Sequence, residues 1–266
     1  MPTLSYSVKG TGRAVVFIHG FCEDKSLWES FITPLCADYK VICIDLPNFG
    51  ESPAMQEISI EQMADAVVDT VKSLDTGKCV VVGHSLGGYV ALAMAELYPE
   101  KLAGLGLFHS TAFGDTPERK ENRNKAIASI KENGVESLVR TLIPSLFSPV
   151  QKQKVSIKQQ MDILIDKAKQ IPPENIIATL QAMRDRKERI EVLENVNFPV
   201  LFIIGKDDIP VPLEASMAQC HLPKNSLVSI MAQVGHMGMI EAEKNCQKIV
   251  KNFLEYCGAY TENTFQ

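Results

Sequence analysis

Short apolar runs alternate with amphipathic stretches along most of this chain, and the alternation limits its possible folds more than any other feature. The runs hold four to eight residues, are rich in valine and isoleucine, and occupy positions 14–19, 40–46, 79–83, 102–109, 200–205 and 226–231. Such runs are typical of strands buried on both faces. Apolar residues spaced three and four apart predict helices at 60–74, 86–97 and 239–254. The sequence therefore predicts an α/β fold with a mostly parallel sheet flanked by helices.

One long segment, residues 111–196, departs from this alternation because it contains no run typical of a strand. Helical spacing covers 155–171, and a second helix begins at Pro172 and Pro173, since proline suits a first helical turn. The segment has a net charge of +3, whereas the remainder of the chain has −8. We therefore predict a core made of residues 1–110 and 197–266, with residues 111–196 inserted as a helical cap.

Composition excludes several classes of protein. The chain has 27 Lys and Arg against 32 Asp and Glu, a net charge of −5, and no long basic run, which argues against a nucleic-acid partner. No segment approaches the roughly 20 apolar residues of a membrane span, and the first residues lack the pattern of a secretory signal. Seven scattered cysteines without a CxxC pair indicate reduced thiols rather than disulfides or a metal site. We expect a cytoplasmic monomer or small homo-oligomer that binds a small-molecule substrate and needs no metal or organic cofactor.

The strongest local signal is a serine between the strand run at 79–83 and the helical stretch at 86–97. The sequence there is Gly83-His84-Ser85-Leu86-Gly87-Gly88. A serine on a sharp strand-to-helix turn needs small residues two positions before and after it, because the backbone is crowded there. The alternative interpretation, a phosphate-binding loop, would require a lysine that this segment lacks. Ser85 is therefore the candidate nucleophile.

A serine hydroxyl needs a general base, and the chain has five histidines. His236 follows the last strand run, at the sheet edge that also carries Ser85, where α/β sheets form their sites. We expect His19 and His84 to have structural roles and His221 to be exposed. An acid must orient the base, and the run at 200–205 leads directly into Asp207 and Asp208. One of these aspartates should face His236 and the other should face solvent.

A serine nucleophile also needs an oxyanion hole with two backbone donors. The first expected donor is the N–H of Leu86, one residue after Ser85. The second is the N–H of Phe21, in the loop after the run at 14–19, where Gly20 permits a close approach of the backbone. These two donors complete the machinery of acyl transfer.

These motifs, together with residues 45–52 (DLPNFGES), resemble the α/β-hydrolase superfamily over nearly the whole chain. The closest resemblance is to its small cap-bearing serine esterases, enol-lactonases and C–C bond hydrolases. It implies Asp208, rather than Asp207, as the acid, because the family places the acid three residues after the glycine. It also implies an eight-stranded sheet with one antiparallel strand near the N-terminus, for which residues 6–8 are the candidate. Asn48 departs from the glycine usual in the family's 45–52 turn, and Ser85 excludes relatives with an aspartate nucleophile.

The substrate pocket should lie between Ser85 and the cap. Its expected walls are Cys22, Trp28, His109, Phe113 and Met237. Apolar residues of the cap, such as Leu142 and Phe147, are expected to contribute as well. For Trp28 and His109, the alternative to contact with substrate is a packing role in the core. The arginines of the predicted cap are either solvated at the surface or available to bind an anionic substrate. The leading hypothesis is a serine hydrolase that cleaves a small carboxylic ester, thioester or lactone. The alternatives are a C–C bond hydrolase, lyase or cofactor-free oxygenase on the same residues, and a non-catalytic ligand sensor.

Overall fold

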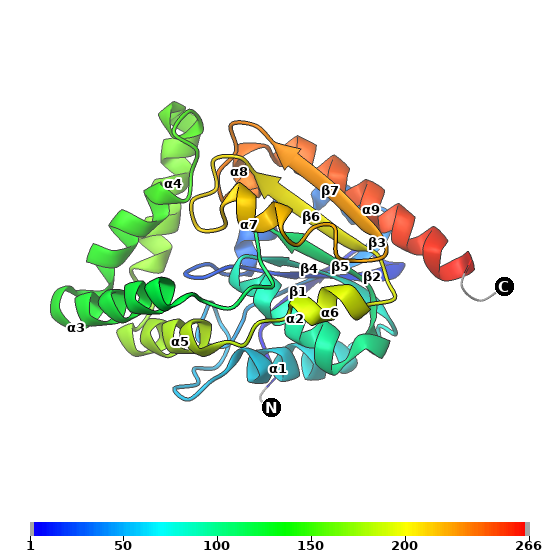
Figure 1. Cartoon of the computed structure of the whole chain (residues 1–266), viewed down its shortest axis with the longest axis horizontal. Helices are drawn as coiled ribbons and strands as arrows, with labels where there is room; N and C mark the ends of the chain where they lie inside the picture. Colours follow the sequence, from blue (N-terminus) through cyan, green and yellow to red (C-terminus); the bar gives the residue numbers. More distant parts are fainter. Residues whose placement is uncertain (1–2, 264–266) are drawn as a thin grey trace.

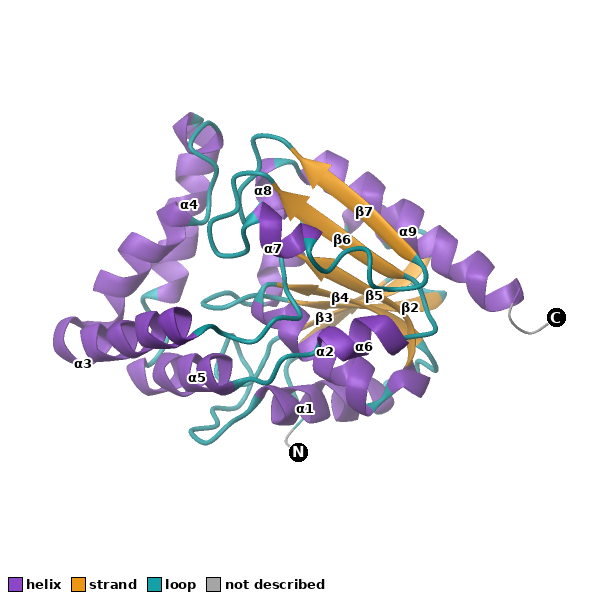
Figure 2. Cartoon of the chain, in the orientation of Figure 1, coloured by secondary structure: helices purple, strands orange, loops and turns teal. Residues whose placement is uncertain are grey.

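A seven-stranded sheet forms the middle layer of this computed structural model, which describes residues 3–263 and side chains up to residue 260 (Figures 1 and 2). The strand order is β1-β3-β2-β4-β5-β6-β7. Only β1 is antiparallel to its neighbour. The strands are β1 (Tyr6–Lys9), β2 (Arg13–Ile18), β3 (Tyr39–Ile44), β4 (Cys79–His84), β5 (Leu102–Phe108), β6 (Val200–Gly205) and β7 (Ser226–Met231).

The expected count of eight strands was wrong for the described part of the chain, although the α/β-hydrolase fold class was correct. The six apolar runs and the antiparallel N-terminal strand are all present, and together they make seven. β1 occupies the outer edge of the sheet. Residues 3–5 before it join no strand, and Ser5 accepts a single backbone hydrogen bond from Asp45 instead of forming a ladder. The eighth strand was implied only by the family pattern, and no apolar run predicted it.

Helices cover both faces of the sheet because alternate strand residues point to opposite sides. Val16 and Ile18 of β2 pack with α1 (Ile60–Lys72) and α2 (Leu86–Leu97). Val15 and Phe17 pack with α9 (Glu243–Asn263) and with the turns η1 (Lys25–Trp28) and η2 (Thr33–Leu35). The shorter elements are η3 (Pro99–Lys101), η4 (Gln151–Gln153), α6 (Ile190–Asn195), α7 (Leu213–Met217) and α8 (Gly238–Glu241).

Between β5 and β6 the chain forms α3 (Pro117–Ser145), α4 (Val155–Ala168) and α5 (Pro173–Asp185). These helices gather beyond the ends toward which the arrows of β6 and β7 point (Figure 1). Gly134, with a φ of 75°, divides α3 into two helical halves. α3 packs against both α4 and α5, whereas α6, the last helix of this segment, packs against α2 beside the sheet. Within residues 3–263, no helix combines the length and the apolar character needed to cross a membrane.

Candidate active site

Ser85 lies where β4 turns directly into α2, and its backbone is strained. Its φ of 49° and ψ of −111° lie in a region that favours glycine. The N–H of Ser85 donates to the carbonyl of Phe108 at the end of β5, 3.0 Å away. This turn lifts the serine off the sheet, and the hydroxyl opens into a pocket under the cap.

The two glycines flanking this turn are required by close backbone contacts. A Cβ on Gly83 would lie 2.2 Å from the carbonyl oxygen of Gly87. A Cβ on Gly87 would lie 2.4 Å from the carbonyl oxygen of Ile18 in β2. The GxSxG spacing therefore reflects the crossing of two strand ends and a helix start within one small volume.

His236 and Asp208 meet at the same edge of the sheet. The Nδ1 atom of His236 lies 2.9 Å from both carboxylate oxygens of Asp208. Burial would raise the pKa of Asp208, but the charge and hydrogen bond of His236, together with the nearby Nδ1 of His109, hold this pKa well below its usual range. The neighbouring Asp207 instead accepts a 2.6 Å hydrogen bond from the hydroxyl of Ser148 in the segment after α3. Asp208, rather than Asp207, is thus the acid that faces His236.

His236 and Ser85 line the same pocket, although no hydrogen bond joins their side chains in this structure. Because Nδ1 of His236 is engaged with Asp208, the free edge of the ring is the one that carries Nε2. Hydrogen bonds between a nucleophile and its base are often loose before substrate binds. The arrangement is therefore compatible with proton transfer from serine to histidine.

His109, which we expected to contact substrate, contacts Asp208 instead. Its Nε2 accepts a 3.2 Å hydrogen bond from the N–H of Gly238, so its proton belongs on Nδ1. That Nδ1 lies 3.1 Å from Oδ2 of Asp208, although it is not aligned for a regular hydrogen bond. Burial lowers the pKa of His109 to about 4 despite the nearby carboxylate. A neutral His109 therefore supports Asp208 as a second imidazole beside Oδ2, the oxygen that His236 also approaches.

The two backbone donors expected for the oxyanion hole have no acceptor within the described residues. Leu86 is the first residue of α2, so its N–H has no partner in the helix, and the N–H of Phe21 likewise donates to no described group. Phe21 also lines the pocket that holds Ser85. Both N–H groups are therefore available to a developing negative charge.

The pocket has a volume of about 260 Å³, with Ser85 and His236 at its floor and residues of α3 and α5 in its roof. Arg119 lies at its wall and donates to the carbonyl of Pro210, but it pairs with no carboxylate of the described residues. Arg123 is neutralised by Asp115, which also pairs with Arg186 at 2.7 Å. The apolar part of the roof consists of Ala126, Leu138, Leu142, Leu146, Leu180 and Met183.

Five side chains predicted to line the pocket lie elsewhere: Cys22, Trp28, His109, Phe113 and Met237. Trp28 is fully buried in an aromatic cluster with Phe17, Phe31 and Phe108. Met237 is buried in the same core layer, and Cys22 lines a separate cleft beside α4. Burial raises the pKa of the Cys22 thiol, which makes it unreactive. Phe113 is half-buried, and its carbonyl accepts a hydrogen bond from Arg186. These residues are near Ser85 in sequence or topology, but packing turns their side chains toward the core.

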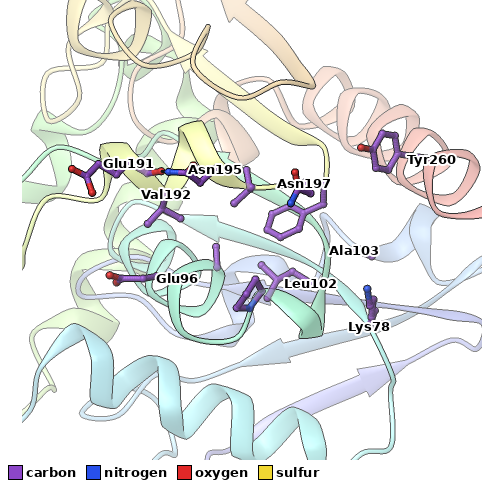
Figure 3. Close-up of a pocket in the computed structure, with 13 residues that line it drawn as sticks. Lys78, Glu96, Leu102, Ala103, Glu191, Val192, Asn195, Asn197 and Tyr260 are labelled. Carbon is purple, nitrogen blue, oxygen red and sulfur yellow. Dashed lines mark hydrogen bonds between the residues drawn. The ribbon is translucent and has the colours of Figure 1, made fainter. Parts of the chain in front are cut away.

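A larger cleft, of about 630 Å³, lies away from Ser85 at the end of the sheet where β5 begins (Figure 3). Apolar residues such as Leu102 and Val192 line it together with the polar residues Lys78, Glu96, Glu191, Asn195, Asn197 and Tyr260. Neither serine nor histidine is among its lining residues. Its size alone therefore does not make it a catalytic site.

Sequence reasoning missed a buried acid at the base of the Ser85 pocket. Glu23 is 7% exposed and lines this pocket together with His84, to which it is hydrogen-bonded. Its only sequence signal was a charged residue two positions after Phe21, which a surface loop would also show. The contribution of Tyr89 from α2 was missed as well, because it reads as part of a buried helix face.

The order of the strands, the helical insertion after β5, and a serine, a histidine and an aspartate at one sheet edge define the α/β-hydrolase class. Residues 13–243 match the sequence model of the family described as alpha/beta hydrolase fold. This match covers most of the chain, and the protein belongs to this family.

Curated relatives include enzymes with several activities. The dihydrolipoyllysine-residue acetyltransferase component of the acetoin cleaving system of Cupriavidus necator is 28% identical over 94% of this chain and 66% of its own length. The chain thus spans just under two thirds of that relative, and 64% of the corresponding component of Pseudomonas putida. The pimeloyl-[acyl-carrier protein] methyl ester esterase of Vibrio cholerae is 25% identical over 93% of this chain and 97% of its own. The 2-hydroxy-6-oxo-6-(2'-aminophenyl)hexa-2,4-dienoic acid hydrolase of Metapseudomonas resinovorans is 27% identical over 94% of this chain and 86% of its own.

A solved structure with high similarity is that of a thermophilic esterase from Thermogutta terrifontis, described as malate bound. It is 29% identical to this chain, with a TM-score of 0.90, over 96% of this chain and 93% of that one. The relatives therefore support a hydrolase of the α/β family, and they include both ester and C–C hydrolases.

Proposed function

We propose that this protein is a serine hydrolase that cleaves a small carboxylic ester, thioester or lactone through an acyl-enzyme on Ser85. One observation carries the proposal: a strained serine opens into the same pocket as a histidine whose other nitrogen lies 2.9 Å from a buried aspartate. Side chains so far apart in sequence converge in this way when a nucleophile, a base and an orienting acid act together.

In this mechanism Ser85 attacks the substrate carbonyl while Nε2 of His236 takes the hydroxyl proton. Asp208 accepts a hydrogen bond from the Nδ1–H of His236 and stabilises the imidazolium that forms. The N–H groups of Phe21 and Leu86 bind the oxyanion of the tetrahedral intermediate. His236 then gives its proton to the leaving oxygen, or sulfur of a thioester. Water attacks the acyl-enzyme in a second, similar cycle, which releases the acid and restores Ser85.

The pocket supports a short or medium acyl chain as the substrate. Its volume of about 260 Å³ lies just below the roughly 300–1,000 Å³ of common small-molecule sites. The leucines of the roof suit an apolar chain, and the unpaired Arg119 suits a polar or anionic group at the far end. The malate-bound description of the Thermogutta terrifontis esterase is consistent with an acidic ligand.

The test is hydrolysis of p-nitrophenyl esters from acetate to palmitate by the wild type and by Ser85→Ala. We expect turnover that peaks at short or medium chains and falls by about 10⁶ in the variant. Equal turnover by the two proteins would refute the role of Ser85. Labelling by a fluorophosphonate provides a readout that does not depend on the choice of ester.

A second candidate is a C–C bond hydrolase on the same residues. The hydrolase of Metapseudomonas resinovorans is as similar to this chain as the ester-cleaving relatives, and this favours retaining it. Full fluorophosphonate labelling together with failure on every ester would support this candidate over the first.

A further inference from the structure

A buried ion pair beneath the pocket connects the three segments that carry the proposed machinery. Oε2 of Glu23, in the loop after β2, accepts a 2.6 Å hydrogen bond from the N–H of Gly20. The same oxygen lies 2.9 Å from Nδ1 of His84, at the end of β4. Nε2 of His84 lies 2.9 Å from the backbone carbonyl oxygen of His236. All the side chains involved are buried, since His84 is 1% and Glu23 7% exposed.

These contacts determine where the protons of His84 lie. A carbonyl oxygen can only accept, so Nε2 of His84 carries a proton toward His236. Oε2 of Glu23 already accepts from Gly20, as expected of a carboxylate oxygen, so Nδ1 of His84 carries the second proton. An imidazolium at His84 paired with a carboxylate at Glu23 satisfies all of these contacts.

The pKa directions of the two groups agree with this assignment. Burial alone would lower the pKa of His84, but the charge of Glu23 and the hydrogen bonds to Glu23 and His236 raise it. Burial alone would raise the pKa of Glu23, but the charge of His84 and its hydrogen bond lower it. An ion pair is favoured on both sides.

We propose that Glu23 and His84 are positioning residues. Their ion pair aligns the loop after β2, which carries Gly20 and Phe21, with the backbone of His236. The pair also holds a fixed positive charge beside the base. The rings of His84 and His236 have their centroids 5.0 Å apart. Because Nδ1 of His84 faces Glu23 and Nε2 faces His236, the positive end of the pair is the end nearer to the base. A Cβ on Gly20 would lie 2.6 Å from Nδ1 of His84 and 2.8 Å from Oε2 of Glu23, so the glycine of this loop leaves room for the pair.

His84 is one of several groups that surround His236. Asp208 lies 2.9 Å from Nδ1 of His236, and the neutral His109 contributes no net charge. Burial raises the pKa of Glu241 in α8. Its carboxylate accepts hydrogen bonds from the N–H groups of Gly235 and Met237, on either side of His236. The remaining charged groups that line the pocket are Arg119 and Arg123 of α3.

The first test concerns the charge of His84 and does not depend on any activity. The full chain, labelled with ¹⁵N-histidine, is examined by NMR at pH 7, with His84 assigned by the signal lost in His84→Gln. We expect both ring nitrogens of His84 to carry protons in the wild type, and a neutral ring in Glu23→Gln. A neutral His84 in the wild type would overturn the proposal, whether or not the variants fold.

The second test rests on the proposed function and follows kcat/KM for p-nitrophenyl butyrate against pH. In Glu23→Gln the pair no longer fixes the positions of Gly20 and of the His236 backbone. The plateau should fall about ten- to a hundredfold, because three loops lose their alignment. Glu29→Gln is the matched control, since Glu29 is exposed in the same region and its amide removes the same formal charge. A plateau in Glu23→Gln as high as that in Glu29→Gln would refute the positioning role of the pair. Failure of every ester with an intact imidazolium signal would count against the proposed function and leave the ion pair established.

Discussion

Replacing Ser85 by glycine should abolish activity and yet make the protein more stable than replacing it by alanine. Ser85 has a φ of 49° and a ψ of −111°, a conformation that glycine adopts without strain and alanine does not. Its hydroxyl makes no hydrogen bond to a described residue, so Ser85→Ala removes the hydroxyl while keeping the strain of the Cβ. Comparison of the two variants therefore isolates the conformational energy of this one residue.

The magnitude follows from two opposing effects. Strain at such a residue is about 1–3 kcal/mol, whereas glycine costs about 0.4–1 kcal/mol through the greater freedom of the unfolded chain. Ser85→Gly should exceed Ser85→Ala in free energy of unfolding by about 1 kcal/mol, which is roughly 2–4 °C in Tm for a domain of this size.

Urea and thermal unfolding of both variants give the assay, with ester turnover measured in parallel. Ser137→Gly serves as the control, because Ser137 is exposed within α3 and glycine there should cost about 0.5 kcal/mol. If Ser85→Gly is no more stable than Ser85→Ala, the strand-to-helix turn does not store strain in the serine, and the reasoning is wrong.

Four further predictions concern the side chains of Asp208, Arg119 and Trp28. Asp208→Asn should lower kcat by about 10⁴, because an amide allows the wrong tautomer of His236; a loss below tenfold in ester assays would contradict the assigned role. The pKa of Asp208 is depressed in the folded state, so its contribution to stability is present above its unfolded pKa of about 3.9 and is lost as pH falls further. Urea midpoints should therefore fall more steeply for the wild type than for Asp208→Asn below about pH 4, and parallel curves would exclude this linkage. Arg119→Gln should reduce kcat/KM about tenfold or more for the p-nitrophenyl monoester of a dicarboxylic acid while sparing p-nitrophenyl butyrate; equal losses on both would show that Arg119 supports only the fold. Trp28→Phe should lower the free energy of unfolding by about 1–3 kcal/mol without changing KM. A changed KM would show that Trp28 contacts the substrate.

Much of the fold was predictable because strands and helices express local patterns. The six apolar runs became β2 to β7 with boundaries within two residues, and the periodic stretches became α1, α2, α4 and α5. The predicted helix at 239–254 is instead divided between α8 and α9, because Ala242 leaves the helical conformation between them. Residues 3–263 also lack the eighth strand that only the family pattern had implied.

The candidate site divides in the same way. Ser85, Asp208 and His236 were identifiable because each follows a strand run at one edge of a parallel sheet, where topology brings loop residues together. Leu142 was predicted as a pocket wall and lines the pocket, but most of the other walls were not identifiable, since a position next to Ser85 does not tell which way a side chain turns. Trp28 and Met237 turned into the core, and Leu138 and Leu180 turned from the cap toward Ser85.

The sequence by itself therefore determined the order of strands and helices, the sharp turn at Ser85 and the chain order of serine, aspartate and histidine. These follow from backbone sterics and from the period of apolar residues, which act over a few positions. Only the tertiary structure decided that Glu23 is buried against His84 and that His109 supports Asp208 rather than the substrate. The physical reason is that the partners lie far apart in the chain, so burial and charge pairing come into being only when the strand ends meet.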